Sequence, residues 1–144
     1  MSLIDAVNES WGWLGLSVSR VHAQNLMGHL VLSDAQDAYF YLDPDGMQVI
    51  ALGTREDALA HLKGEEAKEL WSGGKLVDAA RQKFGDPPQG CVFTLKPHAM
   101  VEGRYDIDEV CILPLDELIR FSGDVARQIH DLPDGSQIQF EVTD

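Results

Sequence analysis

The fold is decided by residues 102–140, which read EGRYDIDEVCILPLDELIRFSGDVARQIHDLPDGSQIQF. Pro114 suits the first turn of a helix, and Asp116 and Glu117 place negative charge at the positive end of its dipole. Apolar and small side chains then recur at three- and four-residue steps: Leu115, Leu118, Ile119, Ser122, Val125, Ala126 and Ile129. This spacing predicts one long amphipathic helix.

Strands are predicted on both sides of this helix. Residues 109–113 form an apolar run before it, and residues 137–142 alternate polar and apolar side chains after it. The segment LPDG at residues 132–135 ends the helix and turns the chain. We therefore expect a β–α–β unit against which the rest of the chain packs.

The earlier part of the chain predicts short strands followed by helices. Three apolar segments joined by polar turns indicate strands: residues 28–32, 38–42 and 47–52. Thr54 and Asp57 have the spacing of a capping box and predict a helix start, and further helical segments and one strand follow at residues 65–70, 75–84 and 91–95. This order predicts a single α+β domain over residues 1–144, with a mainly antiparallel sheet and the long C-terminal helix packed on one face.

The chain is strongly acidic. It has 24 acidic and 11 basic residues, and its formal net charge is −13. Such a field disfavours binding to nucleic acid or an anionic membrane and speeds encounter with a basic partner. Since the chain also lacks the ~20 consecutive apolar residues of a membrane span and an N-terminal secretory signal, we expect a cytoplasmic protein.

The sequence contains no catalytic or cofactor motif. The five histidines lack the spacing of a metal site, and neither a Gly-x-Ser-x-Gly elbow nor a phosphate-binding loop occurs. Asp43 and Asp45 invite a calcium interpretation, but the further ligands of an EF-hand are missing, which favours a plain turn. Cys91 and Cys111 lie in apolar runs and are interpreted as small buried thiols. We expect a non-enzymatic protein without a cofactor.

Several short motifs carry a family resemblance. They are EGRYDIDE at residues 102–109, GDVARQI at 123–129, LPDG at 132–135, VDAA at 77–80 and FG at 84–85. Together they resemble the C-terminal domain of bacterial type VI secretion immunity proteins, most strongly over residues 70–140 and loosely over residues 11–60. That family is often paired with a GAD-like N-terminal domain, for which too few residues precede the match here.

The resemblance implies that the protein neutralises a cognate toxin by forming a stoichiometric complex. The toxins of the family include nucleases, and an acidic protein can occupy the basic cleft that a nuclease needs for its phosphates. The residues expected to contact this partner lie between two predicted strands: Glu102, Tyr105, Asp106, Asp108 and Glu109. Four carboxylates would then meet the partner at the rim and one aromatic ring at the centre. In the competing interpretation, Gly103 simply turns the chain and Tyr105 folds back onto the core.

Two other functions stay open. One is a small regulatory or metabolite-binding domain with a pocket between the sheet and the long helix, around Trp71, His98 and Tyr105. The other is an orphan enzyme. A toxin gene beside the gene for this chain would favour the immunity function over both.

Overall fold

The computed structural model describes residues 3–130 and confirms an α+β fold. The larger sheet is an antiparallel meander in the order β1 (Val18–Gln24), β2 (Leu30–Asp34), β3 (Tyr39–Asp43) and β4 (Gln48–Gly53). A second sheet is the antiparallel hairpin of β5 (Cys91–Leu95) and β6 (Val110–Pro114). The predicted antiparallel character of the sheet is therefore confirmed.

Six α-helices and two 3-10 turns fall within the described residues: α1 (Leu3–Trp11), η1 (Gly12–Leu14), α2 (Arg55–Leu62), α3 (Glu65–Ser72), α4 (Gly74–Phe84), α5 (Pro97–Glu102), η2 (Ile107–Glu109) and α6 (Leu115–His130). The capping box predicted at Thr54 and Asp57 starts α2. None of these helices is long and apolar enough to cross a membrane. The turn at 132–135 and the strand at 137–142 lie outside the described residues.

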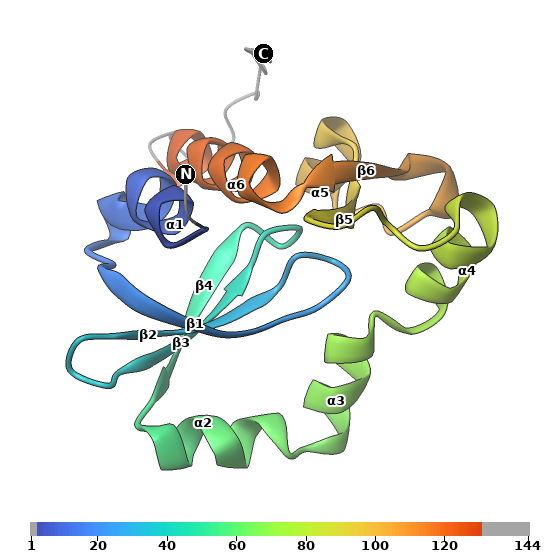
Figure 1. Cartoon of the computed structure of the whole chain (residues 1–144). Coiled ribbons are helices and arrows are strands. Elements are labelled where there is room, and N and C mark those ends of the chain that lie inside the picture. Colours follow the sequence, from blue (N-terminus) through green and yellow to red (C-terminus); the bar gives the residue numbers. More distant parts are fainter. Residues whose placement is uncertain (1–2, 131–144) are drawn as a thin grey trace.

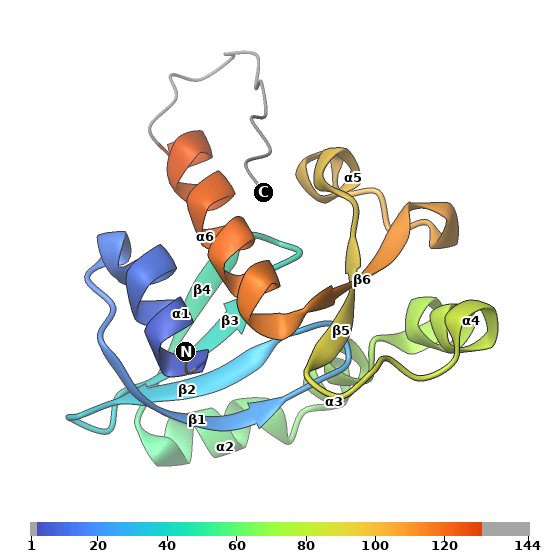
Figure 2. The same ribbon diagram turned by 45° about the horizontal axis from the view of Figure 1, so that its top comes forward.

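Helices cover both sides of the four-stranded sheet. In both ribbon views α1 and α6 lie side by side over one face, and α2 runs along the opposite side (Figures 1 and 2). Strand alternation divides the side chains between the two faces. Leu30 and Leu42 belong to the core under α1 and α6, whereas the paired Val31 and Tyr41 point to the other side, where Trp71 of α3 packs against Tyr41.

The long helix α6 supplies one wall of the core, as predicted. Buried side chains and glycine occur along one face: Leu115, Leu118, Ile119, Ser122, Gly123, Val125 and Ala126, while Ile129 near its end is half-buried. The Nε1–H of Trp11 donates to the carbonyl oxygen of Ile119 at 3.2 Å, which ties α1 to α6. The helices approach closely at Gly123, where an added Cβ would lie 2.8 Å from the carbonyl carbon of Ser10.

The sequence did not predict β1. Only Val18 of this strand is buried, and its other six side chains are exposed or partly exposed. The strand lies at an edge of the sheet and pairs with β2 through two register shifts. An edge strand with irregular pairing needs no regular apolar alternation, so the period-2 signal is absent from its sequence.

Candidate functional site

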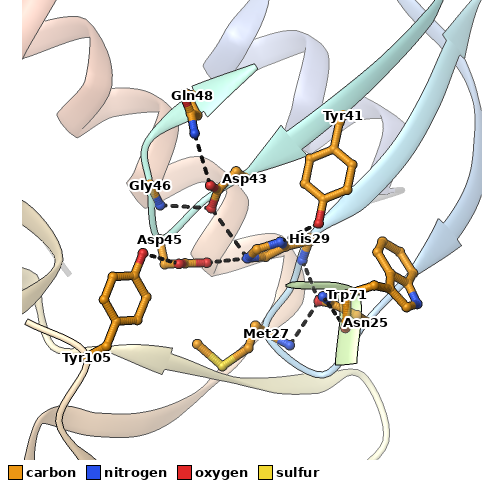
Figure 3. A network of polar contacts seen from close by, with 10 residues as sticks. All are labelled: Asn25, Met27, His29, Tyr41, Asp43, Asp45, Gly46, Gln48, Trp71 and Tyr105. Atoms are coloured by element: carbon orange, nitrogen blue, oxygen red, sulfur yellow. Dashed lines mark hydrogen bonds and ion pairs between the residues drawn. The ribbon is translucent and has the colours of Figure 1, made fainter. Parts of the chain in front are cut away.

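A buried polar cluster lies where the β1–β2 loop meets the β3–β4 turn (Figure 3). The loop is shaped by Asn25, whose Oδ1 accepts the backbone N–H groups of Met27 at 3.0 Å and His29 at 2.8 Å. The Nδ2 group of Asn25 donates to the carbonyl oxygen of Trp71 at 2.9 Å, which fixes the loop against α3. These bonds place His29 directly before β2.

Strand register brings His29 and Asp43 together. Leu30 pairs with Leu42 and Val31 with Tyr41, and continuing this register by one residue places His29 opposite Asp43. The tight turn after β3 then returns Asp45 toward the same point, with the N–H of Met47 donating to the carbonyl oxygen of Pro44 at 3.1 Å. Although they are ionisable, His29, Asp43 and Asp45 are only 3%, 8% and 4% exposed.

The imidazole of His29 contacts a partner at both nitrogens. Its Nδ1 lies 2.7 Å from the hydroxyl oxygen of Tyr41. Its Nε2 contacts Asp45 Oδ1 directly and lies 3.3 Å from Asp43 Oδ1. One ring nitrogen therefore faces two buried carboxylates.

Each carboxylate is held by further donors. Asp43 Oδ1 accepts the N–H of Gly46 at 2.8 Å, and Asp43 Oδ2 accepts from the side-chain amide of Gln48 at 3.2 Å. The hydroxyl of Tyr105 donates to Asp45 Oδ2 at 2.6 Å (Figure 3). Since Tyr105 comes from the segment before β6, this bond joins the cluster to a distant part of the chain.

Burial and mutual charge shift the pKa of each group. Burial alone lowers the pKa of His29, but the hydrogen bond and charge of Asp45 and the charge of Asp43 outweigh it, so the pKa is raised. Burial and the charge of Asp45 raise the pKa of Asp43. Burial also favours the neutral form of Asp45, but its hydrogen bond and charge interaction with His29 lower the pKa below its ordinary value. These pKa shifts favour a protonated His29 beside an ionised Asp45, and they make Asp43 hold its proton more tightly than an exposed carboxyl.

The cluster borders an acidic pocket of about 440 Å³. The lining residues come from the cluster, α3, α4 and the segment before β6: Met27, His29, Asp45, Glu66, Glu69, Gly73, Gly74, Leu76 and Tyr105. Three of these side chains carry carboxylates, and none of the described lining residues is lysine or arginine. The lining surface is mostly apolar, and most of its ionisable side chains are carboxylates, which favours a ligand that carries positive charge.

The segment of residues 102–109 leads from the end of α5 into η2 and β6 and is largely exposed, as expected for a connection. Glu102, Asp106 and Asp108 are exposed. Arg104 lies 3.1 Å from Glu102 and 3.3 Å from Glu109, so two of the four carboxylates share one guanidinium. Glu109 also pairs with His98 at 2.8 Å, and its side chain is only 15% exposed, which makes it the least available of the four.

Tyr105 has features of both interpretations of the segment, the exposed partner contact and the ring folded back onto the core. The residue is 52% exposed, yet its hydroxyl reaches the buried Asp45. Burial and the hydrogen bond to Asp45 raise its pKa well above the ordinary value, so the hydroxyl keeps its proton. One side of the ring is thus presented to solvent while the hydroxyl is held in place.

The structure does not bring Trp71, His98 and Tyr105 to one pocket. Tyr105 lines the acidic pocket, Trp71 lines a separate pocket of about 390 Å³ with Val31 and Leu62, and His98 lines neither. The acidic pocket is also bordered by α3 and α4, not by α6. The predicted pocket around Trp71, His98 and Tyr105 was wrong because sequence order alone cannot show that α3 packs against the sheet.

The two cysteines are free and half-buried. In the hairpin, Cys91 pairs with Pro114 and Cys111 pairs with Thr94, so the thiols do not face each other. Burial raises the pKa of Cys111, which disfavours a reactive thiolate there.

Sequence reasoning missed His29 as the partner of Asp43 and Asp45. The turn interpretation of residues 43–46 holds, but His29 and Asp43 are fourteen positions apart, beyond the reach of any local spacing rule. The available signal was the antiparallel pairing of the segments at 28–32 and 38–42, which places the start of the first segment opposite the end of the second.

Comparison of the chain with protein-family models, curated proteins and solved structures finds no match.

Proposed function

We propose that the protein is a non-enzymatic binding protein of the immunity type, which neutralises a toxin with a basic surface, such as a nuclease, by forming a stoichiometric complex. The observation that carries this proposal is the segment of residues 102–109, where Tyr105 is exposed between carboxylates. The motif resemblance over residues 70–140 supports the same class of protein.

Several contacts tie the segment to the rest of the fold. Gly103 ends α5 in the left-handed conformation, with φ +68°, and Arg104 bridges Glu102 and Glu109 across the loop. The hydroxyl of Tyr105 is fixed on Asp45. A surface already ordered in the free protein loses little conformational entropy on association, which favours tight binding.

Charge on this segment suits a cationic partner. Asp106 accepts the N–H of Asp108 at 3.1 Å, and among the described residues neither carboxylate has a salt bridge. With a net charge of −13 behind them, these groups would accelerate encounter with a basic surface. The ring of Tyr105 would act as the anchor at the centre of the contact, a role in which tyrosine is common.

Affinity capture from cells of the source organism, followed by mass spectrometry, tests the proposal. The expected partner is a basic protein that arrests growth when expressed alone and does so no longer when co-expressed with this chain. The captured pair should also migrate as a defined complex in size-exclusion chromatography. A captured toxin that still arrests growth in the presence of the chain would contradict the immunity function.

The double variant Asp106→Lys/Asp108→Lys should protect less well than wild type. Asp78→Lys/Asp124→Lys is a matched control, because it makes the same charge change at exposed positions in α4 and α6. Equal loss of protection in both double variants would show that net charge matters but that the segment is not the interface.

The acidic pocket favours one alternative, a small domain that binds a cationic metabolite. A polyamine such as spermidine is a suitable probe, because Asp45, Glu66 and Glu69 line the pocket. Under this alternative, millimolar spermidine raises the melting temperature of wild type but not of Glu66→Gln/Glu69→Gln. An equal shift for both proteins would exclude the pocket as its site.

A further inference from the structure

We propose that His29, Asp43 and Asp45 bind one divalent transition-metal ion, of the kind that accepts imidazole and carboxylate ligands together, such as Mn²⁺ or Zn²⁺. The three side chains offer one nitrogen and two oxygen donors, which lie within 4.8 Å of one another. The site adjoins the partner-binding segment through the bond from Tyr105 to Asp45, but metal binding by the free chain does not require the toxin.

The separation of two of the donors fits a metal ion directly. Two ligand atoms each about 2.1 Å from an ion, at angles of about 90–110°, lie about 3.0–3.4 Å apart. His29 Nε2 and Asp43 Oδ1 are 3.3 Å apart, which is inside this interval. Asp45 Oδ1 contacts Nε2 directly, which is too close for two ligands of one ion, so Asp45 has to shift when the ion binds, and its bond to the hydroxyl of Tyr105 has to adjust with it.

Burial adds a reason for a cation at this point. Two buried aspartates face a single imidazole nitrogen. Without an ion, His29 compensates Asp45, and burial disfavours the charged form of Asp43. A divalent ion balances two carboxylates, and a neutral His29 can then serve as a nitrogen ligand.

The surrounding hydrogen bonds resemble those that orient metal ligands. Nδ1 of His29, the nitrogen that would not bind the ion, lies 2.7 Å from the hydroxyl of Tyr41. Asp43 is oriented by the N–H of Gly46 and by Gln48, with the Gly46 bond at 2.8 Å. Partners of this kind fix the orientation of ligating imidazoles and carboxylates.

An ion can reach the site from the pocket, and the ligand types determine which class of ion binds. His29 and Asp45 form part of the wall of the acidic pocket, so water from the pocket can complete the coordination. Imidazole with carboxylates suits Mn²⁺ and Zn²⁺, whereas Mg²⁺ prefers oxygen ligands and retains its own water. Glu66 and Glu69 in the same wall would raise the local concentration of cations.

Isothermal titration calorimetry of the purified chain with MnCl₂ and with ZnCl₂, in 150 mM NaCl, tests the proposal. We expect one equivalent of at least one of these ions to bind wild type, and MgCl₂ to bind at least about 100-fold more weakly. The substitutions His29→Gln and Asp43→Asn should each weaken binding by at least about 100-fold, since loss of an outer hydrogen-bond partner alone costs 10–100-fold. His98→Gln, which removes an exposed histidine paired with Glu109, is the matched control and should bind as wild type.

The wild-type titration decides the matter even if a variant fails to fold. Absence of one-equivalent binding of both ions to wild type would overturn the proposal. Binding that folded Asp43→Asn or His29→Gln retains at wild-type affinity would overturn it too, because the ion would then sit elsewhere, for example on a free thiol. Failure of these titrations leaves the toxin-binding proposal untouched, since no partner is present.

Discussion

The close contact between α1 and α6 predicts that Gly123→Ala destabilises the protein. An added Cβ would lie 2.8 Å from both the carbonyl carbon and the Cβ of Ser10, closer than such atoms approach in proteins. The obstacle is mainly backbone, so α1 as a whole has to move. That movement would also strain the hydrogen bond from Trp11 to the carbonyl oxygen of Ile119.

Two opposing effects set the magnitude. Alanine in a helix interior is favoured over glycine by about 1 kcal/mol. Overpacking of a tight contact costs about 1–3 kcal/mol, and weakening a buried hydrogen bond adds about 1 kcal/mol. The sum predicts that the free energy of unfolding falls by about 1–3 kcal/mol. At about 3–4 °C per kcal/mol for a chain of this size, the melting temperature should fall by roughly 3–12 °C.

Gly12→Ala is the matched control for this substitution. Gly12 lies in the neighbouring 3-10 turn, and an added Cβ there would meet no atom within 4 Å. It should therefore leave stability unchanged or raise it by less than about 1 kcal/mol, because alanine restricts the unfolded chain. Thermal melts followed by far-UV circular dichroism compare both variants with wild type. A Gly123→Ala protein as stable as wild type would refute the tight packing of α1 on α6.

Three further predictions concern stability and the thiols. Ile119→Ala should lower the free energy of unfolding by roughly 2–5 kcal/mol, because the side chain is fully buried, and chemical denaturation would measure it. Thr54→Ala removes the N-cap of α2 and should cost about 1 kcal/mol in the same assay; an unchanged midpoint would mean that α2 frays independently of the core. Cys91→Ala and Cys111→Ala, made singly, should keep their protective activity apart from a loss of stability, whereas a folded Cys91→Ala protein without protection would indicate that the thiol of Cys91 has a functional role.

Local signals predicted most of the elements correctly. The apolar spacing of Leu118, Ile119 and Val125 identified the buried face of α6, and Thr54 marked the start of α2. The same rules failed for β1, whose edge position leaves it without an alternating pattern. Hydrophobic periodicity arises because one face of an element is buried, so a largely exposed edge strand gives almost no periodic signal.

The polar cluster lay beyond sequence reasoning for a different reason. The turn at Asp43 and Asp45 was recognisable from its residue types, but the third member, His29, is supplied by the pairing of β2 with β3. The fourth, Tyr105, arrives from sixty residues away through its bond to Asp45. Only the tertiary fold determines such contacts. The prediction of an exposed acidic segment at residues 102–109 needed no such knowledge, because it rested on composition between two apolar runs.

Association kinetics with the captured toxin test most directly whether the segment of residues 102–109 is the interface. Wild type and Asp106→Lys/Asp108→Lys should be measured at two salt concentrations, with Asp78→Lys/Asp124→Lys as the control. Rim charges act mainly on the rate of association and are screened by salt. We predict that the Asp106/Asp108 variant associates more slowly than wild type and control, with a weaker dependence on salt. Association rates equal to wild type at both salt concentrations would contradict this interface.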